Sequence, residues 1–357
     1  MHARLAAELD LGDSLAFHVE HTDDGILVAT RDAVHAVDGE SLVPRIEAIE
    51  VVDMHGKLVL TPDRLLEVGG RSIALPPVAA GRSRAFAPVP GGGAIVAVSD
   101  FQDLAAAAVI RLDHDGHVVW HTEPRAPARL SGRGSEARPL VPTQWVIHRD
   151  ELCVSGDRVL AIFVDMPRTG IGIGHGIDLE TGRIVYRTAP APHGQLAPAR
   201  PGSFLVGLQG YGAFETQLVD RDGQVAMTWR SHGRVVPGDP VRVIEMENVL
   251  PSRCHASTLL ADGTVHHGPA LPGYDTSPLV IAADRRAVFW RDDTLMYVSA
   301  DGERLYRLLE TPKLGRPFVL GLAGRAPGRM VLSWTTNVEQ DGRVVRRNKL
   351  LWIDLDP

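Results

Sequence analysis

Histidines are the residues of this chain whose chemistry is most adaptable, because imidazole exchanges a proton near neutral pH. The chain holds 15 of them. We predict three as catalytic acids and bases: His193 opens an apolar strand, and His175 and His255 are expected on loops or at loop ends. The neighbours of the last two are Arg168 and Arg253. This arrangement predicts proton transfer at a site built from several loops.

A second group of side chains is suited to holding an anion. Guanidinium offers a planar fork of donors, and imidazole adds a tunable charge. The predicted substrate-binding residues are Arg84, His148, Arg149, Arg242, Arg316 and Tyr211. The alternative interpretation is that these arginines lie on the surface or in contacts between repeats.

Metal and nucleophile chemistry remain alternatives. A divalent metal centre would need His148, His175, His193 and His255 to be brought together by the fold, since no HExxH motif is present. Cys254 beside His255 is a weak candidate nucleophile, because neighbouring strand residues alternate faces. The glycine-rich segment 171–176 precedes no helix, so we expect a loop and not a dinucleotide site. No cofactor is predicted.

The elements that would position these residues form a repeat of about forty residues. Its unit is a strand, an acidic or glycine turn and a second strand, and it recurs at 111–123, 177–189, 218–230, 259–267 and 297–309. Gly223, Gly263 and Gly302 are 40 and 39 residues apart. That is the length of one four-stranded blade of a β-propeller.

The repeats predict a single all-β domain over 1–357, a β-propeller of eight four-stranded blades. The predicted blades are 13–44, 45–78, 82–124, 148–190, 193–232, 240–272, 276–311 and 316–357. The last blade lacks a strand, which residues 2–12 are expected to supply, so that no sheet edge is left exposed. Seven blades, with 240–272 as an insertion, is the alternative.

The turn unit, best seen in IDLETGRIVYRT, resembles the blade signature of the quinoprotein-like propellers with PQQ-type repeats. In those propellers an Asp, a Thr-Gly turn and an aromatic residue recur and dock neighbouring blades, so the resemblance implies the same contacts here. It transfers no function. The chain lacks the adjacent cysteine pair and the export signal of the quinone enzymes, so a quinone cofactor is not expected. The segment 193–207 is faintly similar to arylsulfotransferase-like propellers, in which the position of His193 is catalytic.

Composition excludes several classes of protein. Hydrophobic residues make up 44% and charged residues 23%, as in a globular protein with an ample core. The net charge of −7 and the absence of a basic run argue against binding to nucleic acid or to a membrane. With two cysteines and no signal segment, we expect a soluble, cytoplasmic monomer.

Long segments outside the predicted strands gather on one face of the propeller in this assignment. They are 124–147, 165–176, 209–214, 232–240 and 336–348. Loops on a rigid scaffold commonly carry function. We therefore predict a non-redox enzyme (a lyase, hydrolase or group transferase) that acts on an anionic small molecule at the channel mouth. The alternative is a non-catalytic scaffold that binds a protein or a ligand.

Overall fold

The structure is a computed structural model of the chain. It describes residues 2–16, 18–47, 49–80, 82–99, 107–124, 145–147, 151–165, 171–188, 191–192, 194–210, 213–229, 232–236, 240–247, 253–272, 280–281, 285–311, 314–315, 317, 319–324, 328–340 and 342–356. These ranges contain β-strands, turns and no α-helix. Two compact units are distinguished: unit 1 comprises 1–59, 67–71 and 231–357, and unit 2 comprises 60–66 and 72–230.

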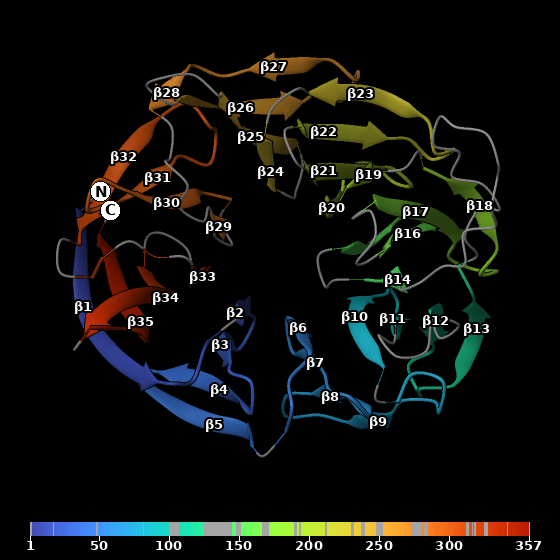
Figure 1. The fold of residues 1–357 in the computed structure, drawn as a ribbon, viewed down its shortest axis with the longest axis horizontal. Helices are drawn as coiled ribbons and strands as arrows, with labels where there is room; N and C mark the ends of the chain where they lie inside the picture. The colour runs from blue at the N-terminus through green and yellow to red at the C-terminus, as the bar shows by residue number, and fades with distance from the viewer. Residues whose placement is uncertain are drawn as a thin grey trace. The chain divides into compact units, whose positions relative to one another are not determined.

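Eight antiparallel sheets follow one another along the chain, as the labels of Figure 1 show. They are the blades of an eight-bladed β-propeller, numbered here in chain order. The predicted fold class is therefore confirmed, and the seven-bladed alternative is wrong, since segment 240–272 contributes strands to a sheet of its own.

Unit 1 contains blades 1, 6, 7 and 8. Blade 1 is β2(His18–Thr22), β3(Gly25–Ala29), β4(Ala33–Asp38) and β5(Ser41–Glu47). Blade 6 is β24(His232–Val236), β25(Val241–Glu247), β26(Arg253–Leu259) and β27(Val265–His267), with β28(Leu271–Pro272) beside β26. Blade 7 is β29(Val280–Ile281), β30(Ala287–Arg291), β31(Thr294–Val298) and β32(Leu305–Glu310). Blade 8 is β33(Val319–Gly324), β34(Gly328–Gln340), β35(Arg343–Asp356) and β1(His2–Gly12).

Unit 2 contains blades 3, 4 and 5, and blade 2 draws residues from both units. Blade 2 is β6(Asp53–His55), β7(Leu58–Leu60), β8(Arg64–Glu67) and β9(Ser72–Ala74). Blade 3 is β10(Ser83–Pro88), β11(Ala94–Val98), β12(Ala108–Leu112) and β13(Val118–Thr122). Blade 4 is β14(Trp145–Val146), β15(Leu152–Ser155), β16(Arg158–Asp165), β17(Ile171–Asp178) and β18(Ile184–Arg187), with β19(Ala191–Pro192) beside β17. Blade 5 is β20(Gly194–Pro198), β21(Phe204–Gly210), β22(Ala213–Val219) and β23(Val225–Trp229).

The N-terminal strand completes the last blade. β1 pairs antiparallel with β35, from His2 opposite Asp356 to Gly12 opposite Asn348. The side-chain amide of Asn348 donates to the Gly12 carbonyl at 2.9 Å, where the pairing ends. The expectation that residues 2–12 supply the missing strand is confirmed, and the outer edge of β35 is covered along this stretch.

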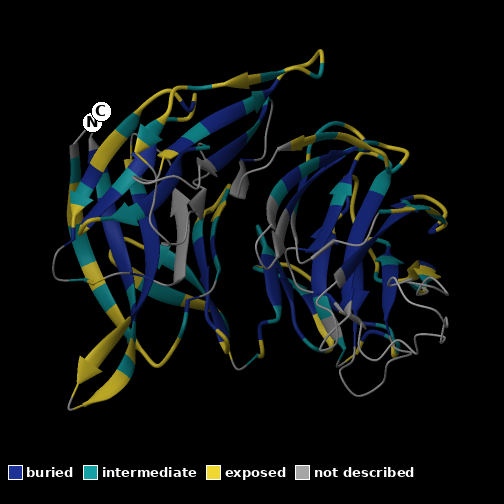
Figure 2. Cartoon of the chain, turned by 45° about the horizontal axis from the view of Figure 1, so that its top comes forward, coloured by how far each residue is buried: buried dark blue, intermediate teal, exposed yellow. Residues whose placement is uncertain are grey.

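The apolar core lies between blades, where strands present alternate residues to their neighbours (Figure 2). In unit 2, Ile95 and Val109 of blade 3 belong to one buried cluster with Phe163 and Ile173 of blade 4. In unit 1, Val288 and Leu295 of blade 7 share a cluster with Trp334 of blade 8. Packing between sheets, more than within one sheet, therefore buries the largest side chains.

A turn glycine in one blade receives a side chain from the blade before it. A Cβ placed on Gly182 would lie 2.6 Å from Cδ2 of Trp120, and one on Gly223 would lie 2.4 Å from Cδ2 of Tyr186. The indole N–H of Trp120 also donates to the Leu179 carbonyl at 2.8 Å. Both glycines have positive φ, at 72° and 82°, which glycine adopts at little cost.

The described parts of several segments that we expected to be loops lie in strands instead. Residues 171–176 belong to β17, residues 209–210 and 213–214 to β21 and β22, residues 232–236 to β24, and residues 336–340 and 343–348 to β34 and β35. Glycine does not make 171–176 a loop, because the side chains of Thr188 and Tyr186 fill the space beside Gly174 and Gly176. Segment 124–147 falls mostly outside the described residues.

The contact between the Trp120 ring and Gly182 predicts a large loss of stability in Gly182→Ala. Gly69 has nearly the same φ, 75°, yet a Cβ there meets nothing within 4 Å. Gly69→Ala should cost about 1–2 kcal/mol from backbone strain alone. Gly182→Ala should cost about 1–3 kcal/mol more, because the methyl group overlaps the Trp120 ring. Chemical denaturation measures both, and equal losses would show that the aromatic contact does not constrain the turn.

Candidate functional site

His175 is a core residue and not a loop residue. It lies in β17, is 1% exposed, and its Nδ1–H donates to the Ile173 carbonyl at 3.1 Å. Its ring meets that of Phe163 edge-on, with centroids 6.1 Å apart. The expectation of a loop position is wrong because β17 pairs along its length with β16.

His255 also lies in a strand, β26, opposite Glu245 of β25. Its expected loop position is wrong because blade 6 begins earlier than predicted, with β24. The segment of His255 is therefore the third strand of the blade, β26. The Nε2 atom of His255 contacts the carboxylate of Glu245 directly. This histidine therefore belongs to a polar cluster within one sheet.

Of the predicted anion-binding residues, the structure describes only Arg84 and Arg242, and these two lie in different blades. Arg242 lies in β25, and its guanidinium donates to the Ala300 carbonyl in the β31–β32 turn of blade 7, so it serves a contact between blades. Arg84 lies in β10 and is partly exposed. The other predicted site residues fall outside the described residues: His148, Arg149, His193, Tyr211 and Arg316.

The cysteines offer no nucleophile. Both are buried, and burial raises the pKa of Cys153 to about 12 and that of Cys254 to about 11. A thiol with such a pKa is protonated at neutral pH, and the thiolate is the reactive form.

A cluster of ionisable side chains joins the first strands of blades 1 and 2, within unit 1. Asp53 of β6 is 1% exposed. Its Oδ1 lies 3.1 Å from Nε2 of His18 in β2, and its Oδ2 lies 3.6 Å from Nε2 of His55. Glu20 of β2 interacts electrostatically with all three, and its carboxylate accepts a hydrogen bond from the N–H of Gly56.

Strand alternation explains why these four side chains meet. Successive residues of a strand point to opposite faces, so His18 and Glu20 share one face of β2, and Asp53 and His55 share one face of β6. Met54, between the last two, is fully buried. The polar pairs of two neighbouring strands thus face each other.

The two carboxyl groups have pKa values shifted in opposite directions. Burial raises the pKa of Glu20, and the nearby histidines offset only part of that effect. Burial alone would also raise the pKa of Asp53, but a hydrogen bond from His18 and the imidazole of His55 beside it lower it well below its ordinary value. Asp53 therefore stays ionised and orients the imidazoles, while Glu20 holds its proton to higher pH.

This arrangement can move protons. A carboxyl with a raised pKa is suited to donating a proton, and an imidazole held by a buried carboxylate is suited to accepting one. His55 is the more accessible of the two histidines, with 42% of its side chain exposed. We name His18, Glu20, Asp53 and His55 the acid–base cluster.

Sequence reasoning missed this cluster, although a signal was present. His18 and Glu20, like Asp53 and His55, are two residues apart in short strands that open successive blades. In each pair the residue between the two polar ones is apolar and buried, Val19 or Met54, and this period of two indicates one shared polar face.

Comparisons with known proteins support the fold alone. No protein-family model matches the chain, and no curated protein matches it. It is similar to a chain in the crystal structure of a mitotic checkpoint complex, with 10% identity, a TM-score of 0.52, and coverage of 98% of this chain and 94% of that one. Two further solved structures match with lower scores. They are KlHsv2 with loop 6CD replaced by a Gly-Ser linker (9% identity, TM-score 0.46, coverage 97% and 100%) and a europium-containing methanol dehydrogenase (9%, 0.42, coverage 99% and 93%).

The resemblance to quinoprotein-like propellers is thus supported only as far as the β-propeller fold. Identity of this order does not distinguish one repeat type or function from another. Within the described ranges, the structure contains no helix long and apolar enough to span a membrane.

The buried carboxylate predicts a pH-dependent loss of stability in Asp53→Asn. At pH 7 the variant should unfold about 1–3 kcal/mol more easily, because His18 loses its charged hydrogen-bond acceptor and His55 loses the carboxylate beside it. Since the pKa of Asp53 is depressed in the folded state, its contribution is present above the unfolded pKa of about 3.9 and is lost as the pH falls further. The difference from wild type should therefore shrink below about pH 4.

Urea denaturation at several pH values measures this difference. Asp63→Asn is the control, because Asp63 pairs with Arg64 at an exposed site and should contribute far less. A difference for Asp53→Asn that did not depend on pH would contradict the ionised, hydrogen-bonded state of Asp53.

Proposed function

We propose that the protein is a non-redox enzyme that catalyses proton transfer on a small molecule at the acid–base cluster. One observation carries the proposal: two carboxyl groups with opposite pKa shifts meet two imidazoles. Pairs of titratable groups whose environments separate their pKa values are typical of catalytic acids and bases.

The exposure and contacts of each side chain suggest its role. His55, the more exposed imidazole, would act as general base and take a proton from water or from a substrate hydroxyl. Glu20, with its raised pKa, would act as general acid and donate a proton to the leaving group. Asp53 would act as a positioning residue, because it is buried and holds both imidazoles through its two oxygens.

Hydrolysis, elimination and group transfer each need one general acid and one general base. The proposed reaction is therefore one of these three classes. The anionic nature of the substrate is part of the proposal and comes from the sequence prediction alone, since Arg242 serves a contact between blades. The cluster itself contains two carboxyl groups, so an anion would have to be balanced by the protonation of Glu20 and by the imidazoles.

Turnover of esters tests the proposal. A panel of unsubstituted phenyl carboxylate, phosphate and sulfate esters samples acyl, phosphoryl and sulfuryl transfer, and its phenolate leaving group needs the proton that Glu20 would donate. We expect turnover of at least one ester and a loss of about 10²–10⁴-fold in both Glu20→Gln and His55→Gln. Glu20→Gln should not lower stability at pH 7, because it removes a carboxylate that burial disfavours.

His114→Gln is the matched control, because His114 is an exposed turn histidine of blade 3 that pairs with Asp115. Turnover that survives both cluster substitutions would contradict the proposal and favour a binding scaffold, and no turnover of any ester would contradict its hydrolytic and group-transfer forms.

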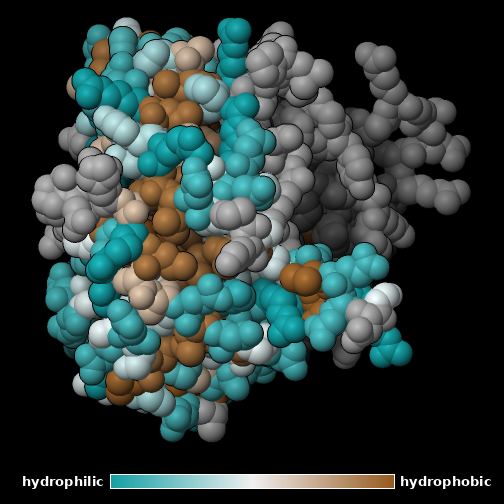
Figure 3. Space-filling view, turned by 90° about the vertical axis from the view of Figure 1, so that its left-hand side faces the viewer, coloured by the Kyte–Doolittle hydropathy of each residue, from teal (hydrophilic) through white to brown (hydrophobic). Residues whose placement is uncertain are grey.

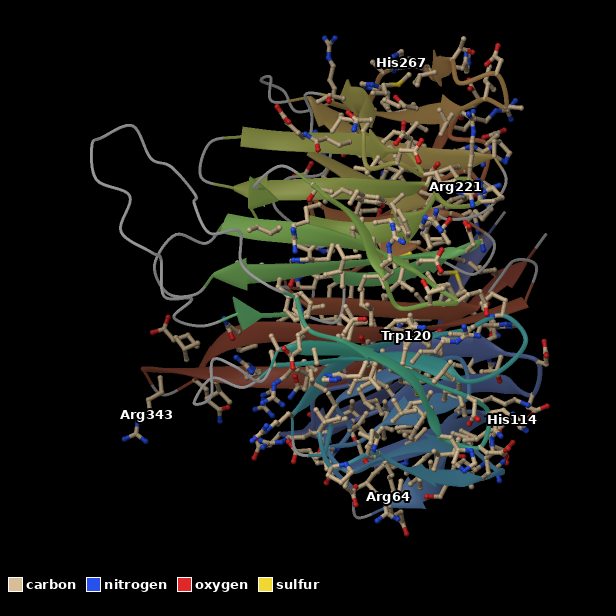
Figure 4. The ribbon with its side chains drawn as sticks, turned by 90° about the vertical axis from the view of Figure 1, so that its right-hand side faces the viewer. Arg64, His114, Trp120, Arg221, His267 and Arg343 are labelled. Atoms are coloured by element: carbon tan, nitrogen blue, oxygen red, sulfur yellow. The ribbon has the colours of Figure 1, made fainter. Side chains whose placement is uncertain are left out.

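The scaffold alternative is favoured by the hairpin β34–β35. Thr335 is the last residue of β34 that pairs with β33, and Asn348 is the first residue of β35 that pairs with β1. Between them, residues 336–340 and 343–347 pair only with one another among the described strands. Figure 4 shows this hairpin projecting with Arg343 at its tip, and Val344 there is 74% exposed. Open edges and exposed apolar side chains suit the addition of a strand from a protein partner.

Hydrophobic side chains also gather among hydrophilic ones on the side of unit 1 that carries β1 and β32 (Figure 3). Leu5 of β1 and Tyr306 of β32 are among the exposed hydrophobic residues. A protein partner of this chain is therefore the second candidate, and the similar propeller chain belongs to a structure of a complex.

A further inference from the structure

Three potential metal ligands lie on one face of blade 6, in unit 1. Glu245 of β25 stands opposite His255 of β26, and Ser257, two residues further along β26, stands opposite His267 of β27. Because a strand repeats its side-chain direction every two residues, Glu245, His255, Ser257 and His267 all project from the same face. The opposite face carries Ile244, Cys254 and Ala256, which pack in an apolar cluster with blade 7.

The side chains converge on one point. Nε2 of His255 contacts Oε2 of Glu245, and Nδ1 of His267 lies 3.9 Å from the same oxygen. The two imidazole rings are 5.4 Å apart between centroids, at 70° to each other. One carboxylate oxygen and two imidazole nitrogens thus lie within 4.8 Å of one another. Ligands of one zinc ion stand about 2.0–2.2 Å from the metal, so small side-chain shifts would close this set around an ion.

A second observation points to a cation. Glu245 is only 3% exposed, and its other oxygen, Oε1, is buried with no hydrogen-bond partner among the described residues. A buried carboxylate oxygen without a donor is costly, and a coordinated metal ion is one of the few groups that satisfies it.

Access is provided from one side. The side chain of His267 is 55% exposed and that of His255 is 15% exposed. The three ligands are therefore buried at Glu245 and accessible to solvent at His267. The Ser257 hydroxyl lies 2.7 Å from Nδ1 of His267, and a metal ion would take over the nitrogen lone pair at that position. Figure 4 places His267 at an outer edge of the structure.

We infer that Glu245, His255 and His267 form a binding site for one divalent zinc ion. Imidazole and carboxylate ligands together suit zinc, and three protein ligands leave a coordination position for water or a substrate. The site is separate from the acid–base cluster and shares no residue with it. It differs from the metal set expected from sequence in every residue except His255.

Zinc titration of the full-length, tag-free protein tests the inference. Protein stripped with a chelator is titrated with Zn²⁺ against a chromophoric competitor, and Co²⁺ is added separately to record its d–d absorption. We expect one strongly bound ion per chain, a visible spectrum of four-coordinate cobalt, and a rise in melting temperature with zinc.

The substitutions separate this site from others. His267→Gln, at an exposed position that should fold normally, and Glu245→Gln should each weaken zinc binding by at least 10-fold. His266→Gln is the matched control, because His266 is the adjacent residue of β27 on the opposite face and should leave the affinity unchanged. Asp113→Asn controls for the exposed group of Asp113, Asp115 and His117.

Three results would overturn the inference: no stoichiometric binding, affinity unchanged in His267→Gln and Glu245→Gln, or affinity lost in His55→Gln or Asp113→Asn instead. Loss in His55→Gln would move the metal to the acid–base cluster. Zinc binding and ester turnover are read separately, so either proposal can fail without the other.

Discussion

The docking of a side chain onto the turn glycine of the next blade is the contact on which the architecture depends. In the turn of blade 5, the Asp220 carboxylate accepts from the N–H groups of Asp222 and Gln224, at 2.9 Å and 2.8 Å, and Gly223 completes the turn with positive φ. The ring of Tyr186 then occupies the space where a Cβ of Gly223 would be. A single position thus serves both the local turn and the packing between sheets.

The same device recurs with different side chains. Ile73 of blade 2 packs against Gly116 of blade 3, and Ala256 of blade 6 packs against Gly302 of blade 7. A ring is therefore not required, only an apolar atom that excludes a Cβ. The repeat is conserved in geometry while its residue types vary, which explains why the turn glycines are easier to recognise in the sequence than the aromatic partners.

Fixed blades bring polar residues of separate strands together, and the acid–base cluster follows from that placement. Asp53 and His55 belong to one sheet and His18 and Glu20 to another, so no local motif unites them. The burial that raises the pKa of Glu20 works against stability, and such conflicts concentrate at functional sites. The zinc ligands of blade 6 are different, because three strands of one sheet supply them.

The sequence predicts the fold well and the site poorly, for physical reasons. Glycine spacing follows from the turn geometry, so the blades and the closing strand β1 could be predicted. The strand β24, HGRVV, is short and polar at its start, so blade 6 was expected to begin at 240, and His255 was assigned to a loop. His175 was misassigned because glycines that accommodate Tyr186 and Thr188 look like loop residues in the sequence. The sequence shows each polar pair of the acid–base cluster, but not that two strands about thirty-five residues apart bring the pairs together.

The acid–base cluster depends on the separation of its two carboxyl pKa values, which carbon-13 NMR titration of the Glu20 and Asp53 carboxyl groups measures. We expect a midpoint for Glu20 above the usual value of about 4.3 and one for Asp53 below about 3.9. Titration of both groups at their ordinary values would contradict this expectation, because an acid–base cluster without separated pKa values has no distinct acid and no fixed base.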